Sequence, residues 1–300
     1  MPSVVVITAS TGRAVLRRCV ESVRDQDSPD VRHLVVVDGP RFAACADEAL
    51  DGVDRDKRLE LLVLPRNTGH SQHYGYRIYG ALPLLVDDDI VCFLDEDNWF
   101  DADHVSSALD ALLSTGAEWA YSLRRIRTHR GELICEDDSD SLGHWPKFAT
   151  LLSPDHLSQP EIDFHRRHPN LVDSSCYILP RPVACAVAPL WQQVHADSVV
   201  PSFLVEEHAG VCTGRSTLNY ALGGGSGTPD DWFTHGNRSI REAYGTGPLP
   251  WRQAPRRLGP GSLRHPARVA DQVDEALPTT ASRQQCEAAG PRRGPGEERP

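Results

Sequence analysis

The sequence has no apolar run of the roughly 18 to 20 residues that a helix needs to cross a bilayer. Its amino terminus, Met1-Pro2-Ser3, also lacks the basic segment and the small-residue cleavage site of a secretory signal peptide. Both absences argue against a protein that spans a membrane or is secreted. We therefore expect a soluble, cytoplasmic protein without a transmembrane segment.

None of the eight cysteines lies in a Cys-x-x-Cys pair. Several stand inside apolar runs instead, as Cys92 does between Ile90 and Leu94. Isolated cysteines in apolar surroundings are typical of reduced thiols in a protein core. The pattern excludes a disulfide framework and a cysteine-based zinc site.

Basic residues are fewer than acidic ones. The sequence has 31 lysines and arginines and 42 aspartates and glutamates, which gives a formal net charge of -11. A protein that binds nucleic acid along its phosphate backbone needs the opposite balance, so we expect no nucleic-acid partner. A phosphate-rich ligand would need a counter-ion. The 40% apolar content of this 300-residue chain is enough for a buried core.

Aromatic residues are scarce at the end of the chain. Residues 246–300 contain 9 of the 23 prolines and 6 of the 23 glycines but a single aromatic residue, Trp251. A segment of this composition buries too little apolar surface to offset the entropy of ordering it. We predict that 246–300 is a disordered tail.

Four short apolar runs, rich in β-branched residues, lie in the first 125 residues: 4–8, 31–37, 59–64 and 90–94. Such runs are typical of strands in a parallel sheet that is covered on both faces. Between them, apolar residues recur at helical spacing around 15–23 and, after the last run, around 105–113. Alternating strands and helices predict a doubly wound α/β sheet, which binds ligands at the carboxyl ends of its strands.

The pattern after residue 125 is less regular. It predicts a β-hairpin over 126–135 with its turn at 129–131, an extended run over 171–179, and a helix from Pro182 to about Trp191.

Polar residues follow each predicted strand: Thr8 to Gly12, Asp38 to Pro40, Arg66 to Gly69, and Asp95 to Asn98. Because parallel strands end at one edge of a sheet, these four loops are expected to converge. Asp95 and Asp97 are two residues apart and project to the same side of an extended chain. They can share one hard divalent cation, or divide its binding with that of a ribose hydroxyl. The alternative interpretation is an acidic cluster at the start of the following helix.

The ordered series Val-Val-Val-Ile-Thr-Ala-Ser-Thr-Gly-Arg, Val-Val-Val-Asp-Gly, Arg-Asn-Thr-Gly-His and Val-Cys-Phe-Leu-Asp-Glu-Asp-Asn resembles that of a family 2 glycosyltransferase. The resemblance covers residues 3–125 and, faintly, 170–222. It implies the glycosyltransferase A fold: a doubly wound, mostly parallel sheet with a Rossmann-like nucleotide-sugar-binding half, 1–125, and a mixed acceptor-binding half, 126–245. It also implies a nucleotide-diphosphate sugar donor, with a UDP-sugar favoured, a hydroxyl acceptor, Mg²⁺ or Mn²⁺, and transfer with inversion.

The resemblance assigns five residues to the nucleotide: Thr8 and Ser10 beside the nucleoside, Asp38 on the base, and Arg66 and Asn67 in a loop that closes over the base. It assigns Asp95 to the ribose or the metal and Asp97 directly to the metal. From its position, His235 is a candidate third metal ligand carried by a carboxyl-terminal loop, the alternative being an ordinary loop histidine.

Displacement of a nucleoside diphosphate with inversion needs a base that takes the proton of the acceptor hydroxyl. In the resembled family this base is an acidic residue beyond a later strand and short helix. Asp197 fits that order and Asp173 is the rival, with Glu206 and Glu207 as further alternatives.

Two other functions remain open from the sequence alone. A nucleotidyltransferase has a similar sheet, but its first loop is Gly-rich and basic, whereas Thr8 to Arg13 holds one glycine and one arginine. A catalytically inactive protein that binds a nucleotide sugar would carry the same strand-end residues without turnover.

Overall fold

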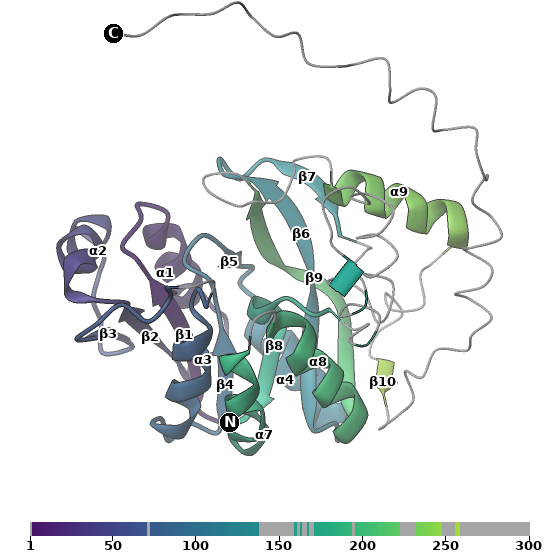
Figure 1. Cartoon of the computed structure of the whole chain (residues 1–300), viewed down its shortest axis with the longest axis horizontal. Coiled ribbons are helices and arrows are strands. Elements are labelled where there is room, and N and C mark those ends of the chain that lie inside the picture. The colour runs from purple at the N-terminus through teal and green to yellow at the C-terminus, as the bar shows by residue number, and fades with distance from the viewer. Residues whose placement is uncertain are drawn as a thin grey trace, which may run out of the picture. The chain divides into compact units, whose positions relative to one another are not determined.

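The computed structural model describes residues 2–70, 73–137, 159–160, 163, 167, 171–193, 196–222, 232–247 and 256–258. These residues all lie in one compact unit, Met1–Arg264. Their strands form one ten-stranded mixed sheet in the order β10-β9-β6-β8-β4-β1-β2-β3, with β5 paired to β9 and β7 paired to β6 (Figure 1).

The first half of the sheet consists of four parallel strands: β1 (Val4–Ser10), β2 (Val31–Val37), β3 (Leu59–Val63) and β4 (Ile90–Phe93). Each begins and ends within two residues of its predicted bounds. Val5 and Val6 in β1 are completely buried, as are Val91 and Cys92 in β4, because helices cover both faces of this part of the sheet. The predicted doubly wound α/β architecture is confirmed.

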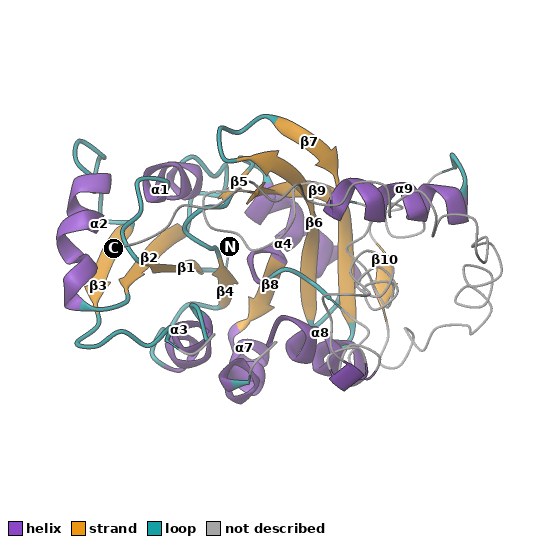
Figure 2. Ribbon diagram, turned by 45° about the horizontal axis from the view of Figure 1, so that its top comes forward, coloured by secondary structure: helices purple, strands orange, loops and turns teal. Residues whose placement is uncertain are grey.

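The helices are α1 (Leu16–Arg24), α2 (Ala43–Ala49), α3 (Tyr76–Ala81), α4 (His104–Thr115), α7 (Arg181–Val187), α8 (Ala196–Glu207) and α9 (Trp232–Tyr244). Figure 2 shows α1 on one face of the sheet and α3, α7 and α8 on the other. Gln26, just after α1, accepts a hydrogen bond from the Val105 amide of α4 at 3.0 Å. This bond holds α4 beside α1.

The second half of the sheet is mixed: β5 (Trp99–Phe100), β6 (Trp119–Thr128), β7 (Leu133–Glu136), β8 (Tyr177–Pro180), β9 (Gly210–Leu222) and β10 (Arg256–Leu258). The predicted hairpin is confirmed as β6 and β7. The predicted extended run over 171–179 is wrong in part, because a 3₁₀ turn over Ser174–Cys176 (η3) precedes β8. The predicted helix ends as α7 at Val187 and continues as the 3₁₀ helix η4 (Ala188–Gln192), where Pro189 lacks the amide donor that an α-helix would use.

Two further 3₁₀ helices complete the described elements: η1 (Pro40–Phe42) and η2 (Leu82–Leu84). Within the predicted tail, β10 pairs antiparallel with β9, so these three residues are ordered as a strand. Residues 248–255 and 259–300 lie outside the described part, and the prediction of disorder there stays a prediction. Among the residues that the structure describes, no helix is both long enough and apolar enough to cross a membrane.

Most of the cysteines with a described environment follow the sequence prediction. Cys19, Cys92, Cys176 and Cys212 are buried. Cys135 and Cys185 are only partly buried, and Cys45 lies exposed on α2.

Strand direction determines which residues meet at one edge. β6 runs antiparallel to β8, and β8 runs antiparallel to β4, so β6 and its parallel neighbour β9 point the same way as β4. The carboxyl ends of β1, β2, β4, β6 and β9 therefore share an edge with the amino end of β8. Residues that follow β4 and residues that precede β8 are brought face to face.

Two buried histidines, His33 and His104, make stability depend on pH. His33 Nε2 lies 2.8 Å from Thr8 Oγ1, and His104 Nδ1 lies 2.9 Å from Thr217 Oγ1, while the second nitrogen of each ring is buried without a hydrogen-bond partner among the described residues. Burial lowers the pKa of His33 to about 3 and that of His104 to about 3. Both rings are therefore neutral in the folded protein.

We expect the free energy of unfolding to fall by about 2 kcal/mol as the pH drops from about 6.5 to 4.5. In this window the unfolded chain protonates both histidines and the folded chain neither, so stability rises with pH. Asp95, whose pKa burial raises to about 7, acts in the opposite direction and offsets one histidine. Urea unfolding at several pH values measures the slope. A stability that increases on acidification would contradict the neutral, buried state of the two rings.

Candidate active site

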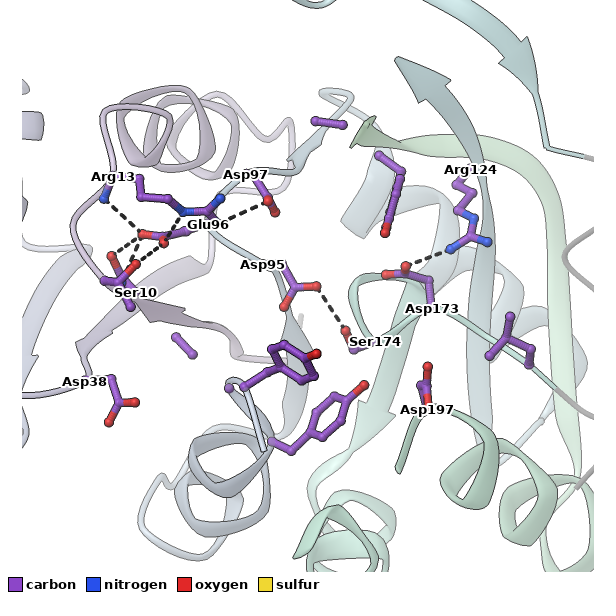
Figure 3. A pocket seen from close by; sticks show the side chains of 18 of the residues that line it. Ser10, Arg13, Asp38, Asp95, Glu96, Asp97, Arg124, Asp173, Ser174 and Asp197 are labelled. Atoms are coloured by element: carbon purple, nitrogen blue, oxygen red, sulfur yellow. Dashed lines mark hydrogen bonds and ion pairs between the residues drawn. The ribbon is translucent and has the colours of Figure 1, made fainter. Parts of the chain in front are cut away.

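A cavity of about 580 Å³ lies at the edge of the sheet where these strand ends meet (Figure 3). Figure 3 shows Ser10 and Asp38 on one wall, Asp95 in the centre, and Asp173 and Asp197 on the opposite wall. The polar lining comprises Ser10, Thr11, Arg13, Asp38, Asp95, Glu96, Asp97, Arg124, Asp173, Ser174 and Asp197, with aromatic contributions from Tyr74, Tyr76, Tyr220 and Phe233.

The cavity carries a large excess of negative charge. Among the described residues that line it, six are aspartate or glutamate and two, Arg13 and Arg124, are basic. Both arginines are already bound to two carboxylates each, Arg13 to Glu96 and Asp97, and Arg124 to Asp137 and Asp173. A diphosphate entering this space would meet net repulsion unless a cation came with it.

Asp95 lines the cavity two residues after the end of β4. Its Oδ1 accepts a hydrogen bond of 2.6 Å from the Tyr79 hydroxyl, and its Oδ2 one of 3.4 Å from Ser174 Oγ. Burial, together with the nearby charges of Asp173 and Asp97, raises the pKa of Asp95 to about 7. Asp95 thus joins the first half of the sheet, through Tyr79 of α3, to the turn that precedes β8.

Asp97 sits higher in the cavity than Asp95, and its side chain is 26% exposed. The only hydrogen bond described for its carboxylate comes from Arg13 Nη2 at 3.0 Å. Asp95 and Asp97 therefore face one cavity, as their spacing predicted. The residue between them does not share this exposure, since Glu96 is buried against the loop after β1.

Asp38 lines the cavity, but its carboxylate is saturated by one loop. Oδ1 accepts from the amide and hydroxyl of Thr68 at 2.7 and 2.9 Å, and Oδ2 accepts from Asn67 Nδ2 and the Gly69 amide at 3.0 and 2.9 Å. Four donors occupy the lone pairs of both oxygens. Asp38 fixes the loop of Asn67 in place, so a nucleobase would have to displace one of these bonds to reach it.

Three residues predicted at the nucleoside or its base do not line the cavity: Thr8, Arg66 and Asn67, which binds Asp38 instead. Thr8 is completely buried, with its hydroxyl bound to His33 and 3.6 Å from Cys19 Sγ. Arg66 is exposed, outside the cavity lining. Ser10, which the same pattern predicted, does reach the cavity, and its hydroxyl donates to Glu96 at 2.6 Å.

The opposite wall is held by a buried ion-pair network around Arg124 of β6. Its Nε binds the fully buried Asp137 at 2.7 Å, and its Nη1 binds Asp173 at 2.7 Å. The guanidinium also lies 5.0 Å from the ring of Tyr220 and 5.1 Å from that of Phe233. The other oxygen of Asp173 accepts from the Ser175 amide at 2.9 Å, which caps η3.

Both candidate bases, Asp173 and Asp197, line the cavity. Asp197 stands in the first turn of α8, half-buried. Glu206 and Glu207, the further alternatives, lie in the last turn of α8, exposed and outside the cavity lining. The structure therefore brings the first two candidates to the site and not the glutamates.

His235 was predicted on a loop, and the structure places its backbone in α9 instead. Phe233, two residues earlier in α9, reaches the cavity. The side chain of His235 lies outside the described part of the structure, so its assignment as a metal ligand stays a prediction.

The sequence pattern did not predict Arg124, Tyr79 or Ser174 as residues of the site. Arg124 and Tyr79 act from the interior of regular elements, where no strand-end signal marks them. Ser174 stands in Val-Asp-Ser-Ser-Cys, a polar interruption just before the apolar residues of β8. Like the polar loops after β1 and β4, this interruption marks the end of a strand at the cavity. It comes before its strand because β8 runs antiparallel to β4.

The residues present fit a divalent cation that is bound jointly with a ligand. Among the described residues, no group of three or more histidine, cysteine, aspartate or glutamate side chains is arranged to hold a metal. Asp95 and Asp97 offer two carboxylates beside open cavity space. Mg²⁺ is commonly held by one or two carboxylates together with substrate phosphates and water, and Mn²⁺ favours the same oxygen ligands.

Comparison with solved structures shows the fold. The crystal structure of S. aureus TarS 1-349 matches with a TM-score of 0.50 at 12% identity, over 73% of this chain and 60% of that chain. The same protein in complex with UDP-GlcNAc matches with a TM-score of 0.50 at 11% identity, over 92% of this chain and 71% of that chain. The chain has the glycosyltransferase A fold and spans less than two thirds of the first of these TarS chains. No curated protein matches it.

A family model describes the part of the chain that carries the strand-end residues. The model of glycosyl transferase family 2 matches residues 3–134, from the start of β1 into β7. This span contains Ser10, Asp38, Asp95 and Asp97. Residues 3–134 of this protein therefore belong to glycosyl transferase family 2.

Proposed function

We propose that the protein is a glycosyltransferase that transfers a sugar from a nucleotide-diphosphate sugar to an acceptor hydroxyl, with inversion at the anomeric carbon and with the help of a divalent cation. One observation carries this proposal. The strand-end residues of the family segment and two carboxylates from the second half of the sheet face into the same cavity.

The donor is proposed to be a UDP-sugar, because the TarS structure with the same fold was solved with UDP-GlcNAc. Its nucleoside would lie toward Ser10 and Asp38, and its diphosphate toward Asp97. Asp38 keeps the loop of Asn67 and Thr68 closed beside the nucleoside. The sugar is then left in the centre of the cavity, between Asp95 and the opposite wall.

Asp97 would hold the cation, with Asp95 as the second carboxylate and the donor phosphates completing the ligands. A divalent cation at this place supplies stabilisation of the negative charge that develops on the departing diphosphate. A cation is needed because the two arginines described in the cavity lining already bind carboxylates and do not neutralise the diphosphate.

We propose Asp197 as the base that takes the proton of the acceptor hydroxyl. Both oxygens of Asp173 already accept hydrogen bonds, one from Arg124 and one from the Ser175 amide. A proton taken by Asp173 would neutralise the carboxylate that pairs with the buried Arg124. Asp197 lines the same wall at the start of α8, and its approach to the sugar lies across the cavity from Asp97. An attack from that side gives inversion.

Replacing Asp197 with asparagine is expected to lower kcat for UDP release about 100-fold, because general-base catalysis contributes at least that factor. The assay supplies a panel of UDP-sugars with Mn²⁺ and a panel of hydroxyl acceptors. Glu207→Gln, a carboxylate of the same helix outside the cavity, is the matched control and should keep the wild-type rate.

Other outcomes would redirect the assignment. A large loss of kcat for Asp173→Asn with little change for Asp197→Asn would make Asp173 the base. Saturable binding of UDP without turnover on any acceptor would identify a nucleotide-sugar-binding protein instead of an enzyme. Release of pyrophosphate from a nucleoside triphosphate would identify a nucleotidyltransferase.

A further inference from the structure

Glu96, the middle residue of Asp95-Glu96-Asp97, is buried and bound to the loop that follows β1. Its carboxylate accepts hydrogen bonds from Ser10 Oγ at 2.6 Å, Thr11 Oγ1 at 2.7 Å and the Thr11 amide at 3.1 Å. It also accepts one of 2.7 Å from Arg13 Nε. With 5% of its side chain exposed, Glu96 is a fixed anchor rather than a ligand-binding group.

Arg13 uses two different parts of its guanidinium. Nε is bound to the buried Glu96, whereas Nη2 reaches into the cavity and binds Asp97 at 3.0 Å. The Arg13 side chain is 42% exposed and the Asp97 side chain 26% exposed, so this second bond is open to solvent. One end of the guanidinium is therefore anchored and the other is exchangeable.

The exchangeable bond occupies the carboxylate that the cation needs. Arg13 and a divalent cation are both positive, and close to the same Asp97 oxygens they repel each other. When a cation binds, Nη2 is freed while Nε stays on Glu96. A freed guanidinium edge then faces the part of the cavity assigned to the diphosphate, and guanidinium is well suited to phosphate oxygens.

We propose that Arg13 is a tethered counter-ion: anchored on Glu96, it covers Asp97 when no cation is bound and turns to the diphosphate of the donor when a cation takes Asp97. This inference rests on the proposed function, because it requires a cation at Asp97. It makes Arg13 a binding residue for the donor and Glu96 the positioning residue that aims it.

The test measures Mn²⁺ binding directly, by the electron paramagnetic resonance signal of free Mn²⁺ in the absence of any donor. Arg13→Gln removes the competitor, so Mn²⁺ alone is expected to bind about fivefold more tightly than to the wild type, the order of an exposed ion pair. Calorimetry at saturating Mn²⁺ gives the second readout. There, UDP is expected to bind about tenfold more weakly to Arg13→Gln, while uridine binds equally to both proteins.

Two further variants keep the outcome interpretable. Arg24→Gln removes a partly exposed arginine of α1 whose ion pair is with Asp25, and it should bind Mn²⁺ and UDP as the wild type does. Arg13→Lys keeps the positive charge but loses the planar guanidinium, so its affinities for Mn²⁺ and UDP should lie between those of the wild type and Arg13→Gln. It replaces Arg13→Gln in the test if that variant does not fold.

Equal Mn²⁺ affinity in the wild type and Arg13→Gln would overturn the inference and leave the proposed function standing. Unchanged UDP affinity at saturating Mn²⁺ would overturn the assignment of Arg13 to the diphosphate. If neither the wild type nor the variants bound Mn²⁺, with or without UDP, both the inference and the cation requirement would be wrong.

Discussion

Replacing Asp97 with alanine is expected to lower the rate of UDP release from a UDP-sugar about 1000-fold, which corresponds to about 4 kcal/mol of transition-state stabilisation. Asp97 faces the cavity, and the structure describes no hydrogen bond to its carboxylate other than that of Arg13. Without it, the cation is left with Asp95, which the Tyr79 hydroxyl and Ser174 already engage. The charge that develops on the diphosphate would then lose most of its stabilisation.

The measurement is kcat/KM for UDP release at several Mn²⁺ concentrations. Asp25→Ala is the matched control, because Asp25 is an exposed aspartate at the end of α1 that pairs with Arg24. Thermal unfolding should show Asp97→Ala to be folded, since Asp97 is partly exposed and holds no element together. Full activity of Asp97→Ala would remove the basis for a cation-assisted reaction.

The first half of the sheet could be predicted because its strands are buried on both faces. Their sequences are then continuous apolar runs, and the first polar residue marks the strand end. Val31–Val37 was predicted with both bounds correct, and Asp38 directly follows it. The positions of Ser10, Asp38, Asp95 and Asp97 at the cavity could be predicted in this way, since each lies at or shortly after the end of a parallel strand.

The contacts that decide what each residue does could not be read from this pattern. Asp38 and Thr68, which are 30 positions apart, meet only because β2 and β3 are neighbours. Thr8 and Ser10 look equivalent in the sequence, yet Thr8 is bound to His33 below the cavity and Ser10 to Glu96 within it. Local periodicity predicts which face a side chain takes, but not its partner on another element.

Replacing Arg124 with methionine is expected to lower the free energy of unfolding by about 3 to 5 kcal/mol. Arg124 is 3% exposed, and it binds one carboxylate through Nε and another through Nη1. Methionine fills much of the same volume but removes the guanidinium that binds Asp137 and Asp173. Asp137 is completely buried, so the loss of this ion pair is costly in a medium of low dielectric. Urea unfolding measures the loss.

Arg125→Met is the matched control one residue further along β6. Arg125 pairs with Asp101 and Glu136 in a partly exposed position, so its loss is expected to cost less than about 1 kcal/mol. Adding Asp137→Asn to Arg124→Met removes the buried charge that had paired with Arg124 and should recover part of the stability, which a double-mutant cycle would show as coupling. Equal losses of unfolding free energy for Arg124→Met and Arg125→Met would mean that packing alone holds the cavity wall that contains Asp173. A clear difference would mean that one arginine keeps that wall in place, because Arg124 ties residue 137 after β7 to residue 173 before β8.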